Sequence, residues 1–277
     1  MTSPVSANST GHTGSGIDGG AEIHPTAVVD AEAVIGSGTI VGPYCVIGPK
    51  VRLGARCLLR NHVTIEGPSE IGDENHFFPG SVVGSRPQDL KYRGEETLLV
   101  VGSRNIFREC VTINRGTVGG GGKTSIGNGC LFMAYSHVAH DCHLGNEVIL
   151  ANAATLAGHV TIGDCAAVGG LTPVHQFVRI GPYAFIGGQT RISQDVVPFA
   201  RIAGIPPLFL GANSIGLKRR GFSEEVVEEI SKALRILFRG KLTIHAAVKR
   251  IASECRNIQE IRLILEFLRK SERGILR

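Results

Sequence analysis

Ten histidines are present in the 277-residue chain, and their spacing draws attention to one region. His137, His140 and His143 lie together in the segment HVAHDCH, and His159 and His175 follow it. Grouped imidazoles suit two kinds of chemistry. Several neutral imidazoles can bind a metal ion, whereas a single imidazole that titrates near neutral pH can act as a general base. The choice depends on how the chain positions these side chains.

The positions follow from a repeat of six residues. Every sixth residue is bulky and apolar from Ile23 to Val83 and again from Ile126 to Ile192. A helix cannot use a period of six, but coils of short strands and tight corners can. The sequence therefore predicts a mainly β fold, a parallel β-helix with three hexapeptides per coil.

Glycine often follows the apolar residue of a hexapeptide, and we expect these glycines to turn the chain with positive φ. They are Gly36, Gly42, Gly48, Gly54, Gly72, Gly84, Gly127, Gly145, Gly163, Gly169, Gly181 and Gly187.

Counting in coils of 18 residues places His140, Gly158 and Gln176 in one column. His140, His159 and His175 then share one edge of the prism, which we call the histidine edge. Adjacent coils should lie about 4.8 Å apart, the usual strand spacing. We expect His140 to remove a proton from an acyl acceptor, with Asp141 as its partner carboxylate and the Gly158 N–H as donor to the oxyanion.

Two other interpretations of the histidines remain open. Polar corner residues can simply face water. A metal site would need converging imidazoles, but the repeat places His137 and His143 on different faces, with His140 at the corner between them. Ligands from another subunit would still allow a metalloenzyme, although we predict no metal site.

The composition argues against a membrane protein, a secreted protein and a disulfide-stabilised protein. Only 5% of residues are aromatic, which suits a narrow prism better than a globular core. No stretch is apolar enough to span a membrane, and residues 1–20 lack the pattern of a signal peptide, so we expect a cytoplasmic protein without stable membrane insertion. Nucleic acid is not an expected partner. Five cysteines replace small residues at the fifth hexapeptide position and are predicted to be reduced core thiols, namely Cys45, Cys57, Cys110, Cys130 and Cys142.

Breaks in the repeat divide the chain into a disordered tail (1–22), a β-helix (23–197) and a linker with a helical domain (198–277). Two insertions interrupt the β-helix, the first near 84–105 and the second near 118–125, with the repeat resuming between them at Ile106. The second insertion carries a glycine run without P-loop spacing, so we interpret it as a mobile surface loop rather than a phosphate site.

After Pro198 the hexapeptide register ends in a Pro/Gly-rich linker, and helical spacing begins at Val226. Ser223 is the expected N-cap of a helix that stops at Gly240, and at least one further helix is expected through Leu268. Residues 216–277 contain 15 Lys and Arg against 8 Asp and Glu, a net charge of +7. Charge alone leaves open whether this is a solvated surface or a dock for an acidic partner.

The ordered motifs RPQDLKY, VTINRGT, HVAHDCHLGNEVILANAATLAGHVTIGD, VHQFVRIG and GLKRRGF resemble the UDP-N-acetylglucosamine O-acyltransferase family of lipid A biosynthesis, within the hexapeptide-repeat transferases. The likeness runs from about Ile23 to the C-terminus. It implies a left-handed β-helix, a homotrimer with active sites between subunits, and a C-terminal helical domain. The general rule favours right-handed crossovers, so the left hand comes from the resemblance alone.

The implied reaction moves an (R)-3-hydroxyacyl group from acyl carrier protein to the 3-hydroxyl of UDP-N-acetylglucosamine. The resemblance implies no cofactor other than the phosphopantetheine of the carrier protein. Because acyl carrier proteins are acidic, it favours the basic C-terminal region as their dock.

The resemblance also assigns residues. His140 matches the general base, Asp141 its partner and Gly158 the oxyanion donor. Gly188 matches the position that limits acyl length. Positions expected to contact substrate or carrier protein are Gln88, Asp89, Lys91, His137, His159, His175, Gln176, Asn213, Arg219 and Arg220.

Two departures concern substrate detail. Ile215 stands where the family can carry an acidic residue for the uracil end, and Gln189, Thr190 and Arg191 after Gly188 are bulkier and more polar than expected. The sequence therefore does not decide the length of the acyl chain, or whether the acceptor sugar carries a hydroxyl or an amine. The alternatives are the related N-acyltransferase, which resembles a longer chain with an added N-terminal domain, a γ-type carbonic anhydrase, and a non-enzymatic scaffold.

Overall fold

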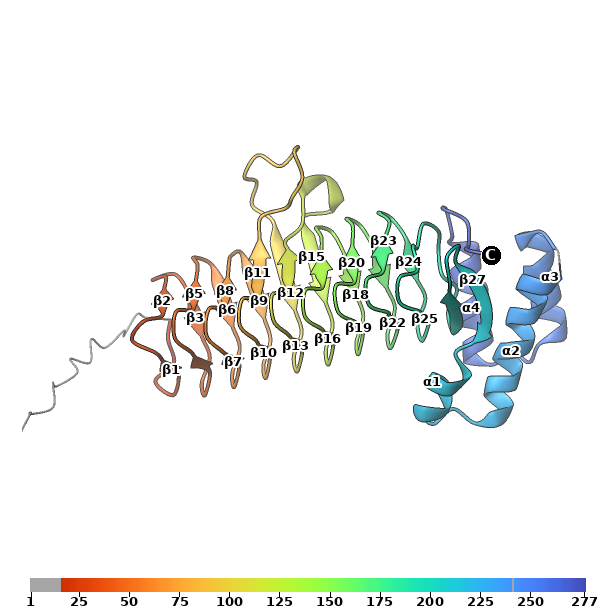
Figure 1. Ribbon diagram of the computed structural model, residues 1–277, viewed down its shortest axis with the longest axis horizontal. Coiled ribbons are helices and arrows are strands. Elements are labelled where there is room, and N and C mark those ends of the chain that lie inside the picture. Colours follow the sequence, from red (N-terminus) through yellow and green to blue (C-terminus); the bar gives the residue numbers. More distant parts are fainter. Residues whose placement is uncertain (1–15, 241) are drawn as a thin grey trace, which may run out of the picture.

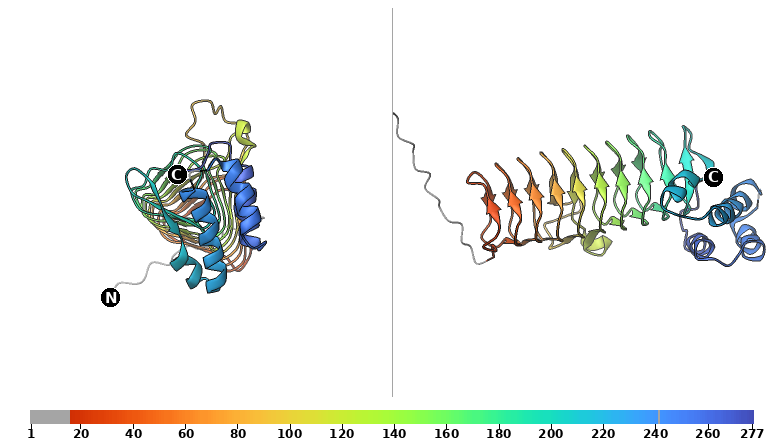
Figure 2. Two further views of the ribbon diagram at one scale, coloured as in Figure 1. Left: turned by 90° about the vertical axis from the view of Figure 1, so that its right-hand side faces the viewer. Right: turned by 90° about the horizontal axis from the view of Figure 1, so that it is seen from below.

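The computed structural model describes residues 16–240 and 242–277. Short strands stack into a long triangular prism, and helices cover the far end of it (Figure 1). Each coil gives one parallel strand to each of three sheets, which form the three faces seen end-on in Figure 2. The predicted β-helix and C-terminal helical region are confirmed.

The first face contains eleven strands, namely β1 (Glu22–Ile23), β4 (Ile40–Val41), β7 (Leu58–Leu59), β10 (His76–Phe77), β13 (Ile106–Phe107), β16 (Leu131–Phe132), β19 (Ile149–Leu150), β22 (Ala167–Val168), β25 (Phe185–Ile186), β26 (Ala200–Ala203) and β27 (Leu208–Ala212). The second face contains β2 (Val28–Val29), β5 (Val46–Ile47), β8 (Thr64–Ile65), β11 (Val82–Ser85), β14 (Thr112–Asn114), β17 (His137–Val138), β20 (Thr155–Leu156) and β23 (Pro173–Val174). The third face contains β3 (Val34–Ile35), β6 (Val51–Leu53), β9 (Ser69–Ile71), β12 (Leu98–Val101), β15 (Lys123–Ile126), β18 (His143–Leu144), β21 (Thr161–Ile162) and β24 (Arg179–Ile180).

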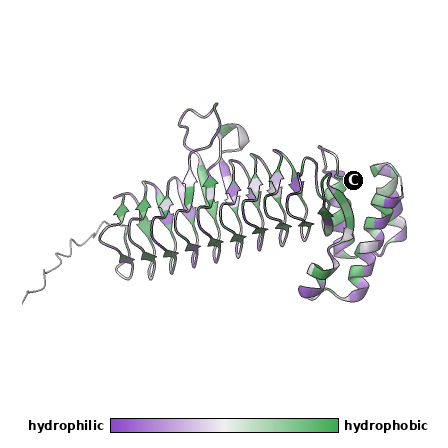
Figure 3. Ribbon diagram, in the orientation of Figure 1, coloured by the Kyte–Doolittle hydropathy of each residue, from purple (hydrophilic) through white to green (hydrophobic). Residues whose placement is uncertain are grey.

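The apolar residue of each hexapeptide points into the prism and forms its core. All of these residues from Ile35 onward are buried, and only Ile23 and Val29, in the end coils, are half-buried. Phe77, Phe107 and Phe132 stack through three successive coils with ring centroids 4.8 and 5.0 Å apart. Green apolar strands in Figure 3 trace this core along the prism.

The expected role of the repeat glycines is wrong for all but one of them. Among the twelve, only Gly84 has a positive φ, whereas the fourth residue of many hexapeptides, such as Tyr44 and Arg56, takes the left-handed conformation. The glycines are needed because neighbouring coils approach closely. A Cβ on Gly36 would lie 2.7 Å from the Ala55 nitrogen, and one on Gly42 would lie 2.8 Å from the Arg60 carbonyl oxygen.

The cysteines are free thiols, and Cys45, Cys57, Cys130 and Cys142 are buried packing residues, as predicted. Burial raises the pKa of the Cys130 thiol to about 11 and that of Cys142 to about 12. Cys110 differs from the prediction. The buried residue that starts its hexapeptide is Phe107, not the 38% exposed Ile106, so Cys110 is a half-buried fourth residue with φ 57°.

The first insertion is shorter than predicted and the second lies three residues earlier, because each ends in a strand of the third face. Uninterrupted coils pair residues 18 apart, as Leu131 with Ile149, but His76 pairs with Ile106 and Ile106 with Leu131. Strands β12 and β15 pair with each other, which leaves residues 86–97 and 115–122 outside the strands. Both insertions project from the same side of the prism (Figure 1).

The predicted tail and linker also contain structure. Residues 1–15 of the tail lie outside the described residues, but Ile17 pairs with Ile35 and so belongs to the first coil. In the linker, β26 continues the first face in parallel with β25, and β27 returns antiparallel to it. Ile202 of β26 is buried, which explains why this segment stays in the prism.

In the described part of the C-terminal region, four helices follow the hairpin: α1 (Ser214–Arg219), α2 (Glu224–Arg239), α3 (Ile244–Glu254) and α4 (Gln259–Arg269). Ser223 caps α2 by accepting the Val226 N–H, and Gly240 is its C-cap, as predicted. Phe238 of α2 stacks on Phe209 of β27 with ring centroids 3.9 Å apart, which ties the helices to the prism. Over the described residues, every helix is too short or too polar to cross a bilayer.

Candidate active site

His140 and Asp141 form a hydrogen-bonded pair at the histidine edge, between the second and third faces. The two side chains come from adjacent residues of one corner, and the φ of 61° at Asp141 turns its carboxylate back toward the imidazole. His140 Nδ1 lies 2.8 Å from Asp141 Oδ2. Because a carboxylate accepts, Nδ1 is assigned as the donor, which leaves the Nε2 lone pair available to take a proton.

Asp141 is held by more than its histidine. Its side chain is fully buried, and Thr117 donates its backbone N–H to Oδ1 at 2.8 Å and its hydroxyl to Oδ2 at 2.6 Å. The Asp141 N–H in turn donates to the Thr124 hydroxyl at 2.8 Å. Buried carboxyl groups need hydrogen-bond partners, and these contacts fix the Asp141 side chain in position.

The Thr117 contacts show that the interpretation of the second insertion as a mobile surface loop is wrong. Thr117 is the N-cap of the 3-10 helix η1 (Val118–Gly120). A Cβ on Gly120 would lie 2.0 Å from Asp141 Cγ, so the glycine run lets the backbone close over the carboxylate. Gly120 thus serves close approach, whereas Gly121 and Gly122 turn the chain with positive φ.

Gly158 lies directly against the His140 ring, one coil away. A Cβ at Gly158 would lie 2.6 Å from His140 Cε1 and 2.9 Å from Nε2. The next residue, His159, donates its N–H to the His140 carbonyl at 3.0 Å, which fixes the two corners together. Among the described residues nothing accepts a hydrogen bond from the Gly158 N–H. A donor without a partner next to a basic nitrogen can bind an oxyanion.

The neighbouring histidines are held in defined orientations. His159 meets His140 edge-on at 5.2 Å between centroids and stacks on Phe177 at 4.4 Å. Burial lowers the pKa of His159, although the Asp141 charge opposes this effect. Burial, and then the nearby His140, lower the pKa of His137, whose Nδ1 lies 2.8 Å from the Thr112 hydroxyl. Both imidazoles are therefore biased toward the neutral form.

His175 and Gln176 complete the exposed part of the histidine edge. They follow β23 in the next coil, and His175 Nδ1 lies 3.1 Å from the Gln176 carbonyl oxygen. His143, by contrast, lies on β18 of the third face, apart from His137 on β17 of the second. The structure thus separates the HVAHDCH histidines as the repeat predicts.

A different group of three residues lies close enough together to bind a metal ion. Ligand atoms of His140, Asp141 and His159 all lie within 4.8 Å of one another, and His159 Nε2 is 3.7 Å from Asp141 Oδ2. Both carboxylate oxygens, however, already accept hydrogen bonds from Thr117. The arrangement fits a proton-transfer pair better than an ion site.

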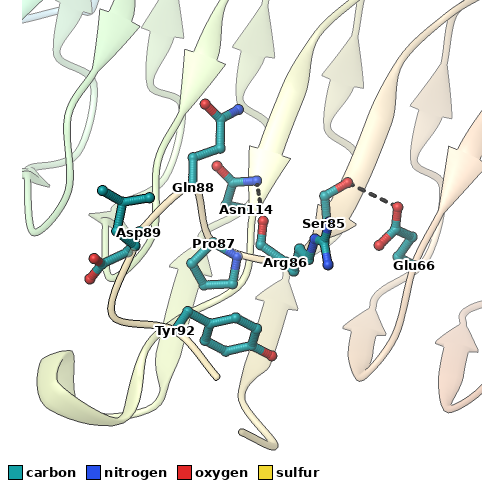
Figure 4. Close-up of a pocket in the computed structure, with 9 residues that line it drawn as sticks. Glu66, Ser85, Arg86, Pro87, Gln88, Asp89, Tyr92 and Asn114 are labelled. Carbon is teal, nitrogen blue, oxygen red and sulfur yellow. Dashed lines mark hydrogen bonds between the residues drawn. The ribbon is translucent and has the colours of Figure 1, made fainter. Parts of the chain in front are cut away.

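The first insertion carries Gln88, Asp89 and Lys91. Gln88 and Asp89 border a polar pocket of about 680 Å³ with Glu66, Ser85 and Asn114 (Figure 4). Asp89 accepts the Lys91 N–H at 2.9 Å, and its charge acts on the pKa of His159, so the insertion reaches toward the histidine edge.

Two residues of the VTINRGT motif, Asn114 and Arg115, hold the first insertion in place by hydrogen bonds. The buried Asn114 donates to the Arg86 carbonyl at 3.0 Å. Arg115 donates to the Gly67 and Gly84 carbonyls at 3.0 and 2.9 Å and to the Tyr92 hydroxyl at 3.2 Å.

Asn213, Arg219 and Arg220 lie elsewhere, around a pocket of about 740 Å³ between the first face, β27 and α1. Asn213 caps α1 by accepting the Gly216 N–H and donates to the Tyr183 carbonyl at 3.0 Å. Arg220 pairs with Glu147 at 2.6 Å. One chain does not bring this pocket and the histidine edge together.

Gly188 lies at a third location, the edge between the first and second faces. It follows β25 and is exposed, and a Cβ there would lie 3.1 Å from the Gly170 carbonyl oxygen. Within one chain it is therefore separated from His140 by the width of the second face.

The sequence prediction missed four residues that shape the histidine edge, namely Thr112, Thr117, Thr124 and Phe177. Phe177 had a usable signal, because it is 18 residues after His159 in the same column as Asp141. The threonines had no such signal, because Thr117 lies within the second insertion and Thr112 and Thr124 lie on either side of it, where the repeat is interrupted.

Fold and site together define an acyltransferase of the hexapeptide-repeat class. The family model described as bacterial transferase hexapeptide matches residues 32–67 and 123–158, and the model of domain 2 of UDP N-acetylglucosamine O-acyltransferase matches residues 195–276.

Solved structures extend the match to nearly the whole chain. LpxA, a UDP-N-acetylglucosamine acyltransferase from Bacteroides fragilis, is 40% identical with a TM-score of 0.90, covering 92% of this chain and 100% of that one. LpxA from Acinetobacter baumannii is 40% identical with a TM-score of 0.83, covering 95% and 100%. The Arabidopsis UDP-N-acetylglucosamine acyltransferase is 34% identical with a TM-score of 0.80, covering 92% and 100%.

The chain belongs to the UDP-N-acetylglucosamine O-acyltransferase family. This confirms the enzyme class expected from the sequence, an acyltransferase of lipid A biosynthesis with hexapeptide repeats.

Proposed function

We propose that the enzyme transfers an (R)-3-hydroxyacyl group from acyl carrier protein to the 3-hydroxyl of UDP-N-acetylglucosamine, with His140 as general base. One observation carries the mechanism. The Nδ1 of His140 is hydrogen-bonded to a buried carboxylate at 2.8 Å, and the imidazole lies against Gly158, whose N–H has no partner among the described residues. A base and an oxyanion donor are thus adjacent, which is what direct acyl transfer requires.

The chemistry proceeds through one tetrahedral intermediate. His140 Nε2 takes the proton of the acceptor hydroxyl as its oxygen bonds to the thioester carbonyl carbon, and the Asp141 carboxylate stabilises the imidazolium that forms. The oxyanion accepts the Gly158 N–H. Collapse breaks the carbon–sulfur bond, and the phosphopantetheine sulfur leaves with the proton from the imidazolium. His140 is neutral again at the end of the cycle.

The remaining site residues have proposed binding roles. Gln88, Asp89 and Lys91, with His137, His159, His175 and Gln176, surround the sugar and the acyl thioester. Arg219 and Arg220 bind the diphosphate or the carrier protein, and Asn213 lies at the nucleotide end. The absence of a side chain at Gly188 leaves room for the acyl chain. The net charge of +7 over residues 216–277 favours an acidic carrier protein as partner.

We further propose a homotrimer whose active site is shared between subunits. The proposed nucleotide pocket opens between the first face and α1, whereas His140 lies at the edge of the second and third faces. One chain therefore carries two separated halves of a site, and a second copy would complete it.

Complementation tests the shared site. We would co-express His140→Ala and Arg220→Ala chains with different affinity tags and purify the mixed oligomers through both tags. These oligomers should regain acyl transfer activity at UDP-N-acetylglucosamine concentrations where each variant alone has little activity. The control pairs His140→Ala with Gly158→Ala, which alter the same edge and should not complement. Equal activity of the two mixed preparations would contradict a shared site.

The product identifies the reaction. Purified enzyme, UDP-N-acetylglucosamine and a mixed pool of (R)-3-hydroxyacyl carrier proteins should yield a 3-O-acyl sugar nucleotide by mass spectrometry, and the same pool reports acyl length. Transfer only to a 3-amino analogue would replace O-acyl with N-acyl transfer. Stoichiometric zinc or iron with CO₂ hydration activity would instead indicate a carbonic anhydrase.

A further inference from the structure

The buried carboxylate beside the proposed base has an unusual environment. Asp141, His159 and Phe177 occupy equivalent corner positions in three successive coils, but only Asp141 is fully covered, with 0% of its side chain exposed. The cover is the second insertion, where η1 places Gly120 directly on the carboxyl group. This insertion therefore belongs to the environment of the proposed catalytic pair.

Thr117 supplies two of the three hydrogen bonds that reach the Asp141 oxygens. Its N–H binds Oδ1, and its hydroxyl binds Oδ2, the same oxygen that faces His140 Nδ1. The hydroxyl contact of 2.6 Å has the length of a charge-assisted hydrogen bond. With both oxygens held, the carboxylate cannot rotate away from the imidazole.

We propose that Thr117 is a positioning residue for acyl transfer, acting through Asp141 on His140. The inference rests on the proposed function of His140. The Thr117 hydroxyl orients Oδ2 and also withdraws negative charge from it. Without this donor, Oδ2 would present more negative charge to the imidazole, so the acid limb of the rate profile would lie at higher pH.

Other titratable groups face the same imidazole and remain unchanged in the test. His137 approaches from β17 and His159 from the next coil, while Asp89 and His143 act on His159. The Thr117 hydroxyl also accepts the Gly120 N–H at 3.2 Å, so its removal loosens the cap of η1 over Asp141 as well as the contact to Oδ2.

The test is Thr117→Val, which keeps the shape and the backbone N–H but removes the hydroxyl. We expect kcat for acyl transfer to fall about tenfold or more, with KM for both substrates within about twofold of wild type. The acid limb of the kcat/KM profile should move to higher pH by about half a unit. Thr117→Ser, which restores the hydroxyl, should recover both quantities.

Thr39→Val is the matched control. Thr39 is also a fully buried threonine whose hydroxyl donates to a carbonyl and accepts an N–H, but it lies near the N-terminal end of the prism, away from Asp141. It should leave kcat and the pH profile unchanged, whatever it does to thermal stability.

A Thr117→Val enzyme with wild-type kcat and an unmoved acid limb would overturn the inference, as would a Thr117→Ser enzyme that stays impaired. If Thr117→Val does not fold, Thr117→Ser alone decides, because it must then retain the wild-type profile. A wild-type enzyme without acyl transfer activity would instead contradict the proposed function itself.

Discussion

Adding a methyl group to Gly158 tests the proposed base and oxyanion donor together. A Cβ at this position would lie 2.6 Å from His140 Cε1 and 2.9 Å from Nε2, whereas ordinary van der Waals contacts begin near 3.4 Å. The imidazole must therefore move by most of an ångström. Misplacement on the order of 1 Å costs about 100-fold in rate, or roughly 2.7 kcal/mol of transition-state stabilisation. Disturbing an oxyanion donor costs a similar amount, so we expect kcat to fall about 100- to 1,000-fold.

The backbone itself should accept alanine, because φ at Gly158 lies outside the left-handed region. Gly158→Ala should thus fold and melt near the wild-type temperature. The matched control is Gly48→Ala on the same face, where the nearest contact of the added Cβ is an ordinary 3.5 Å. Steady-state assays with acyl carrier protein and UDP-N-acetylglucosamine measure kcat and KM separately. A folded Gly158→Ala enzyme that keeps kcat within threefold of wild type would refute the reasoning.

Two further predictions concern the core and pH. Because their pKa values are about 11 and 12, the buried Cys130 and Cys142 thiols should resist alkylation at pH 8 in the folded protein and react after denaturation. Peptide mass spectrometry measures the alkylation of each cysteine. Rapid labelling of either thiol in the folded protein would contradict this prediction. Burial lowers the pKa of His137, so below about pH 6.5 the unfolded chain binds more protons than the folded one and stability falls. Thermal melts from pH 7 to 5 should therefore show a loss of Tm that is roughly 2–4 °C smaller in His137→Gln than in wild type. Equal losses in both proteins would exclude His137 as a source of acid instability.

Periodicity predicted the fold because each coil repeats one physical requirement, an inward apolar residue every sixth position. It also predicted the column of His140, Gly158 and Gln176, since pairing between coils advances by 18 residues. The same regularity misled the interpretation of the glycines, because a repeated small residue can serve either a turn or a close approach between coils. Gly36 and Gly42 are of the second kind.

Sequence reasoning failed mainly where the repeat is interrupted. Thr117 reaches Asp141 across 24 residues, a separation that no whole number of coils produces. The glycine run after it was interpreted as mobile because a sequence cannot show which backbone segment approaches a buried charge. The separation between His140 and Arg220 was also invisible in the sequence, since it depends on which face each element joins.

The activity of His140→Ala tests the central proposal most directly. The variant should fold and assemble as wild type does, yet its kcat/KM for acyl transfer should fall about 1,000-fold, within the range that general-base catalysis contributes. A folded His140→Ala enzyme with activity within tenfold of wild type would contradict the assignment of His140 as the base.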